Sequence, residues 1–193
     1  MTPAEISQAA RALFAAEKSQ KQIGLLTRAH PEMTMDDAYA VQKALVSLKI
    51  ADGRRVIGWK IGLTSKAMQY ALNIDIPDSG ILFDDMYFED CATVPAGRFI
   101  QPRIEAEIAF VMKADLDGAA GRPLVLAATA SVCPALALLD TRIERVDAPP
   151  GHTRTLFDTI SAPAANAGIL LGRAQPDPPT IHLPSPPAIC PPP

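Results

Sequence analysis

One stretch of the sequence indicates the fold most clearly: Arg103-Ile104-Glu105-Ala106-Glu107-Ile108-Ala109-Phe110. Side chains alternate between the two faces of a β-strand, so the stretch predicts a strand with Glu105 and Glu107 on one face and apolar residues on the other. The apolar face predicts a packed core behind the strand. The two carboxylates stand about 7 Å apart, near enough to converge on one small cation. The same alternation is typical of any half-exposed strand, and the pattern alone favours that second interpretation.

Length and composition set the class of protein. The chain has 193 residues, of which 48% are hydrophobic, and this is enough for one domain with a core. A net charge of −3 and only 5% aromatic residues argue against nucleic acid and membrane surfaces as partners, so we expect a small molecule. No signal peptide is visible and the three cysteines are far apart, which favours a cytoplasmic protein.

The pattern of helix and strand signals changes along the chain. Thr2 and Thr34 open two amphipathic helices, so residues 1–54 are predicted to form a small helical N-terminal part. Residues 55–173 predict a strand-rich body, and the class is α+β. From Ala174 to Pro193, nine of twenty residues are proline, which predicts a disordered or polyproline tail. Within the body we expect helices over 65–72 and 124–130 and a loop over 75–80. The longer strands are expected over 56–63, which is predicted to be buried, and over 103–113, 135–140 and 167–172. Short strands are expected near 81–82, 86–88, 93–94 and 99–101.

Two polar residues precede the carboxylate strand. Lys60 lies between two bulky apolar residues, and such a site is expected to lower its pKa unless a carboxylate or an anionic ligand pairs with it. A functional lysine and a structural ion pair with a strand carboxylate both remain open. Asp78 lies in a Pro-Asp-Ser-Gly turn, where aspartate often only bonds its own backbone.

Several motifs follow one another in order: Gly58-Trp59-Lys60-Ile61-Gly62, Pro77-Asp78-Ser79-Gly80, Leu82-Phe83-Asp84-Asp85-Met86, Gln101-Pro102-Arg103-Ile104-Glu105-Ala106-Glu107, Phe157-Asp158-Thr159-Ile160-Ser161 and Ala165-Asn166-Ala167-Gly168. In order and spacing they resemble the hydratases of aromatic catabolism, in the hydratase and decarboxylase branch of the fumarylacetoacetate hydrolase superfamily. Three segments resemble the 2-oxo-hept-4-ene-1,7-dioate hydratases more than the 2-hydroxypenta-2,4-dienoate hydratases: Ser65–Gln69, Arg98–Phe99 and Phe157–Ser161. The resemblance extends from the second expected helix to about Gly172.

The resemblance implies a mixed β-roll body and a lyase that depends on Mg²⁺ or Mn²⁺. Such enzymes add water to a 2-oxo-alkenoate, and they form homo-oligomers. Glu105 and Glu107 match two metal ligands of the family. Lys60 matches a lysine suited to holding a substrate carboxylate or moving a proton, and Asp78 matches a candidate acid or base.

The chain departs from the family pattern at three places. One is Ser161-Ala162-Pro163-Ala164, which stands where the family usually has an Asp-Asn stretch. The family has a third metal-binding glutamate where this chain has Ala137, and Asp140 is expected to point to the opposite face. The family also continues with further strands where this chain enters its proline-rich tail, as a truncation or a frameshift would produce. A decarboxylase of the 4-oxalocrotonate type and a catalytically inert fragment or partner subunit therefore remain open as alternatives.

Overall fold

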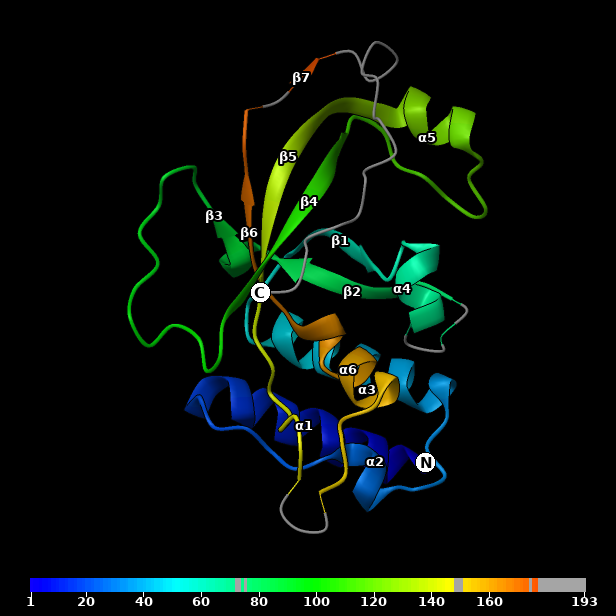
Figure 1. Ribbon diagram of the computed structural model, residues 1–193, viewed down its shortest axis with the longest axis vertical. Coiled ribbons are helices and arrows are strands. Elements are labelled where there is room, and N and C mark those ends of the chain that lie inside the picture. Colours follow the sequence, from blue (N-terminus) through cyan, green and yellow to red (C-terminus); the bar gives the residue numbers. More distant parts are fainter. Residues whose placement is uncertain (72–73, 75, 148–150, 174, 177–193) are drawn as a thin grey trace. The chain divides into compact units, whose positions relative to one another are not determined.

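The computed structural model describes residues 1–71, 74, 76–147, 151–173 and 175–176, and it confirms the α+β class (Figure 1). The elements, in chain order, are α1 (Pro3–Ser19), α2 (Leu26–Ala29), α3 (Met35–Ala51), β1 (Val56–Gly62), α4 (Lys66–Ala71), β2 (Asp78–Phe83), η1 (Asp84–Met86), β3 (Tyr87–Phe88), β4 (Arg103–Met112), α5 (Arg122–Ala128), β5 (Thr129–Leu139), α6 (Leu156–Ser161), η2 (Pro163–Ala165), β6 (Asn166–Leu171) and β7 (Gln175–Pro176).

The chain divides into two compact units. The first comprises Met1–Glu105 and Leu136–Leu170, and the second comprises Ala106–Ala135 with the described residues from Leu171 onward. None of the described helices has the length and the apolar character needed to cross a membrane.

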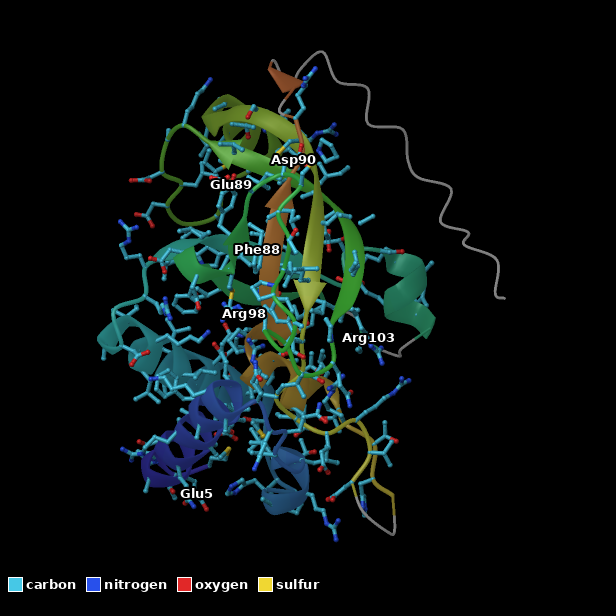
Figure 2. All side chains as sticks on the ribbon, turned by 90° about the vertical axis from the view of Figure 1, so that its left-hand side faces the viewer. Glu5, Phe88, Glu89, Asp90, Arg98 and Arg103 are labelled. Atoms are coloured by element: carbon cyan, nitrogen blue, oxygen red, sulfur yellow. The ribbon has the colours of Figure 1, made fainter. Side chains whose placement is uncertain are left out.

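The helices of the first unit begin where the sequence predicts. Thr2 caps α1 and Thr34 caps α3, and each cap is completed by an acidic residue three positions later, Glu5 and Asp37 respectively. Glu5 is labelled on α1 in Figure 2. Such a capping box satisfies backbone N–H groups that have no partner within the helix. The buried core between α1, α2, α3 and α6 consists of Ala9, Ala10, Leu13, Leu25, Leu26, Met33, Ala38, Val41, Leu45, Ile143, Ile160 and Ala162.

Strands β1 and β2 form an antiparallel pair that carries part of the candidate site. Lys60 lies opposite Gly80, and Gly62 lies opposite Asp78. The prediction that β1 is buried is wrong, because Trp59 is 67% exposed and Ile57 and Ile61 are also exposed. Only the face that carries Lys60 is partly covered. In such a ribbon, alternation sends every second side chain to solvent unless both faces are covered.

The second sheet has the strand order β3-β6-β5-β4, with β7 paired to β5. In the first unit β3 and β6 are parallel, with Tyr87 opposite Ile169. The predicted 103–113 strand is β4, and the predicted helix over 124–130 is α5. The strands predicted over 135–140 and 167–172 overlap β5 and β6, respectively, and each extends one residue past the end of the observed strand.

Three sequence predictions differ from the structure in this region. The short strands expected at 93–94 and 99–101 are absent, because turns and bends occupy the connection between β3 and β4. Asp78 begins strand β2 and does not lie in a turn. The core expected behind β4 is also absent from the described residues, because Ile104 is 66% exposed and Ile108 and Phe110 are exposed as well. The proline-rich tail lies outside the described residues except for β7.

Candidate functional site

Lys60 and Glu105 form an ion pair within the first unit. The Nζ of Lys60 lies 3.0 Å from Oε2 of Glu105. The side chain of Lys60 is only 11% exposed, whereas that of Glu105 is 46% exposed. This pair is the strand-carboxylate partner that the sequence left open, and it brings together two of the four predicted site residues.

Asp78 is the third predicted residue of this cluster and is buried. Its Oδ1 has no hydrogen-bond partner among the described residues. Burial raises the pKa of the Asp78 carboxyl group, and the nearby charge of Lys60 opposes that rise. A carboxyl group that keeps its proton to higher pH is suited to general acid catalysis.

Gly62 makes room for the Asp78 carboxylate. A Cβ at position 62 would overlap Oδ1 of Asp78, so only glycine fits beside the carboxylate as it is placed. At Gly58, by contrast, the nearest atom to an added Cβ lies 3.9 Å away, on the side chain of Leu82.

Glu107 follows Glu105 by two positions on β4 and is half-buried. Alternation along a strand is the basis of the prediction that both carboxylates lie on one face. Among the residues that the structure describes, no group of three or more histidine, cysteine, aspartate or glutamate side chains gathers into a metal-binding cluster. Mg²⁺ keeps several waters and is often held by one or two carboxylates plus substrate oxygens, so a site with two carboxylates stays a prediction.

Asp140 does not replace the missing third glutamate. Both of its carboxylate oxygens accept backbone N–H groups, from Ile100 at 2.9 Å and from Gln101 at 2.7 Å. Asp140 therefore anchors the segment that leads into β4. Ala137 is buried in β5 and offers no ligand atom.

Asn166 is a buried polar residue that the sequence reasoning did not single out. Its side chain is buried, and neither Oδ1 nor Nδ2 has a partner among the described residues. A Cβ added at Gly80, opposite Lys60, would lie 2.6 Å from Nδ2 of Asn166. The only sequence signal was its place in the Ala165-Asn166-Ala167-Gly168 motif.

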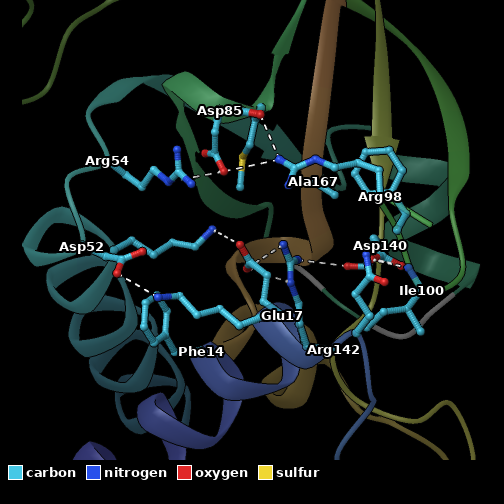
Figure 3. A pocket seen from close by; sticks show the side chains of 15 residues that line it. Phe14, Glu17, Asp52, Arg54, Asp85, Arg98, Ile100, Asp140, Arg142 and Ala167 are labelled. Carbon is cyan, nitrogen blue, oxygen red and sulfur yellow. Dashed lines mark hydrogen bonds and ion pairs between the residues drawn. The ribbon is translucent and has the colours of Figure 1, made fainter. Parts of the chain in front are cut away.

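A cavity of about 190 Å³ lies elsewhere in the first unit and is lined by charged side chains (Figure 3). Glu17 accepts Lys49 at 2.6 Å and Arg142 at 3.1 Å, and Arg98 pairs with Asp85 at 3.3 Å. Burial alone would raise the pKa of Glu17, but these two cations lower it. None of the predicted site residues lines this cavity, and its charged side chains form ion pairs with one another.

Comparison with known proteins gives several relatives, although no family model matches the chain. The chain is 50% identical over 164 residues to the 2-oxo-hept-4-ene-1,7-dioate hydratase of Escherichia coli, a match that covers 84% of the chain and 61% of that protein. It is 40% identical over 186 residues to a 2-keto-4-pentenoate hydratase of Paraburkholderia xenovorans (strain LB400), covering 95% of the chain and 66% of the relative. The chain thus spans less than two thirds of the length of these relatives.

Solved structures of one related enzyme share the fold. The 4-oxalocrotonate decarboxylase from Pseudomonas putida G7, complexed with calcium and acetate, matches with a TM-score of 0.82 and 31% identity, over 91% of this chain and 65% of that chain. The same enzyme complexed with magnesium and adipate matches with a TM-score of 0.81. The fold, the ordered motifs and these relatives agree, and the chain belongs to the hydratase and decarboxylase branch of the fumarylacetoacetate hydrolase superfamily.

Proposed function

We propose that this chain carries the site of a hydro-lyase of aromatic catabolism, which adds water to a 2-oxo-alkenoate resembling 2-oxo-hept-4-ene-1,7-dioate. The observation that carries the proposal is the gathering of Lys60, Asp78 and Glu105 in one unit, with the Lys60–Glu105 pair at 3.0 Å. The 50% identity to a hydratase of that substrate supports the choice of reaction.

Glu105 and Glu107 are the proposed ligands of a Mg²⁺ or Mn²⁺ ion. A divalent ion supplies Lewis-acid polarisation of the 2-oxo group of the substrate. The related decarboxylase is known with magnesium and with calcium, and this supports a hard divalent ion bound by oxygen ligands.

Lys60 is the proposed anchor for a carboxylate of the substrate. Its ammonium group is largely shielded from water, and a charge-assisted hydrogen bond is stronger in such a place. Glu105 pairs with this ammonium group in the structure, so a substrate carboxylate would replace one anion by another.

Asp78 is the proposed proton donor and acceptor. As an acid it can deliver a proton to a carbon of the substrate, and as a carboxylate it can take a proton from the attacking water, which gives a 4-hydroxy-2-oxo acid. The raised pKa of its carboxyl group supports the first of these roles.

Ultraviolet absorbance of a 2-hydroxy-2,4-dienoate tests the proposal, because hydration destroys the conjugated diene. Purified protein with Mg²⁺ is expected to bleach the absorbance, and Lys60→Ala is expected to abolish the bleaching. Stable absorbance with folded, Mg²⁺-supplied protein would exclude the hydratase.

A decarboxylase is the second candidate, because the solved structures that match at 31% identity are of a 4-oxalocrotonate decarboxylase. Release of carbon dioxide from 4-oxalocrotonate, without loss of a supplied dienoate, would favour the decarboxylase.

An inert fragment or partner subunit is the third candidate, favoured by alanine at position 137. Folded protein whose melting temperature does not respond to Mg²⁺ would support this third reading. A homo-oligomer in the cytoplasm is part of the proposal, and sedimentation of the purified chain tests the oligomeric state.

A further inference from the structure

Asn166 begins β6 with a side chain that is 1% exposed and has no hydrogen-bond partner among the described residues, at either Oδ1 or Nδ2. A buried amide without partners costs free energy, because both groups lose their hydrogen bonds to water on folding. An apolar residue of the same size would avoid that cost. The position is therefore not explained by stability of the substrate-free chain.

The backbone turn before Asn166 is strained, and hydrogen bonds hold it in place. Ala164 and Ala165 have φ angles of 51° and 59°, in the left-handed region that favours glycine. The carbonyl of Ala165 accepts the backbone N–H of Asp140 at 2.8 Å, and the carbonyl of Asn166 accepts Nη2 of the buried Arg142 at 2.8 Å. These contacts hold the strained turn in place.

Gly80 provides the space into which the amide points. A Cβ at position 80 would lie 2.6 Å from Nδ2 of Asn166 and would overlap the carbonyl oxygen of Pro163. Gly80 is the register partner of Lys60 on the neighbouring strand. The missing side chain thus leaves the Asn166 amide beside the strand position that carries the proposed substrate anchor.

We propose that Asn166 is a substrate-binding residue, whose Nδ2–H donates a hydrogen bond to a carboxylate or carbonyl oxygen of the 2-oxo acid held by Lys60. This inference rests on the proposed function and adds a residue to it. A 2-oxo acid offers only acceptors to Nδ2, and the water that adds to the substrate can donate to Oδ1. Both unpaired groups then gain partners only in the complex, where the shielded surroundings strengthen such bonds.

Asn166→Leu separates a binding role from a structural one. Leucine has nearly the same size and removes both unpaired groups. The matched control is Gln42→Leu, because Gln42 is also a buried amide but its Nε2 already donates to Ser79 O at 3.0 Å and Ile160 O at 2.8 Å. Melting temperature and calorimetric binding of 2-oxoadipate with MgCl₂ are measured for the full chain; 2-oxoadipate has no double bond to hydrate.

We expect Asn166→Leu to keep or raise the melting temperature and to weaken 2-oxoadipate binding roughly tenfold to hundredfold. Gln42→Leu is expected to lower the melting temperature and to leave the affinity of the folded protein unchanged. A lower melting temperature of Asn166→Leu with wild-type affinity would overturn the inference and show that a structural water pairs the amide. If wild type and Asn166→Leu bind 2-oxoadipate equally, the role of Asn166 is excluded and the proposed function stands. If the wild type does not bind 2-oxoadipate, both the role of Asn166 and the proposed function are overturned.

Discussion

The ammonium of Lys60 lies 3.0 Å from Oε2 of Glu105, the carboxylate proposed to hold the divalent ion. A metal ion bound by Glu105 would therefore compete with the lysine for the same oxygen. Entry of the metal would turn Glu105 away from Lys60 and release the ammonium for the substrate. In the proposed site, the ion pair would thus link metal binding to substrate binding.

Lys60→Met tests this competition. Removing the ammonium is expected to strengthen Mg²⁺ binding by roughly tenfold, about 1.4 kcal/mol, while turnover is lost. Equilibrium dialysis measures the affinity. Lys43→Met, at an exposed position of α3, serves as the control and is expected to bind Mg²⁺ as the wild type does. Weaker Mg²⁺ binding by Lys60→Met would show that the lysine does not oppose the metal.

Gly62→Ala tests the placement of Asp78. The added Cβ would overlap Oδ1 of Asp78, so the carboxylate must move, and a displaced acid is expected to reduce kcat by roughly 10²-fold or more. Gly58→Ala is the matched control on the same strand, since its Cβ meets nothing closer than 3.9 Å. Equal activities of the two variants would argue against a role of Asp78 in the reaction.

Asp78→Asn tests the buried carboxylate through the pH dependence of stability. Burial raises the pKa of Asp78 in the folded state above its usual 3.8, so the folded chain binds the proton more tightly than the unfolded chain. Above the folded-state pKa the buried charge lowers the free energy of unfolding, and below pH 3.8 this cost is absent. Asp78→Asn is thus expected to be more stable than the wild type at pH 7, with a gain that shrinks as the pH falls. Thermal unfolding across pH measures it, with exposed Asp117→Asn as the control; a gain that grows toward low pH would contradict the assignment.

Arg142→Met tests the charged network around the cavity. Arg142 donates to Glu17 and to the carbonyl oxygens of Asp140 and Asn166. Removing one partner of a buried ion pair typically costs about 3–5 kcal/mol, and we expect urea unfolding to report a loss of that size. Arg11→Met, on the exposed side of α1, is expected to change stability by about 0.5 kcal/mol or less. A small loss for Arg142→Met would show that the network contributes little.

Ala137→Glu tests whether the third ligand belongs at this position. A glutamate buried there without metal is expected to lower the melting temperature, and Mg²⁺ is expected to restore it, because the ion pairs the new carboxylate. The wild type should show a smaller Mg²⁺-dependent shift. Equal shifts in both proteins would place the missing ligand elsewhere.

The elements could be predicted from the sequence where local chemistry decides them. The capping boxes at Thr2 and Thr34 fixed the starts of α1 and α3, and the alternation around Glu105 predicted β4. Burial could not be predicted in the same way. Trp59 and Ile104 are apolar but exposed, because coverage of a strand face depends on segments distant in the sequence.

The contacts among the candidate residues could be predicted only in part. Lys60 and Glu105 meet as an ion pair, which the apolar surroundings of the lysine had suggested. Asp78 was expected in a turn, since its Pro-Asp-Ser-Gly context is a turn signal, but pairing with β1 draws it into β2. Asn166 gave no local signal, because its unpaired amide and the space at Gly80 exist only once β2 and β6 are folded.

The initial rate of diene bleaching, compared between the wild type and a Glu105→Gln/Glu107→Gln variant over a Mg²⁺ titration, tests the central claim most directly. The account predicts that the wild-type rate rises with Mg²⁺ and saturates, whereas the variant stays at the uncatalysed rate at every concentration. A variant that bleaches the dienoate as fast as the wild type would contradict the account. So would a wild-type rate that, after treatment with a chelator, does not change when Mg²⁺ is added.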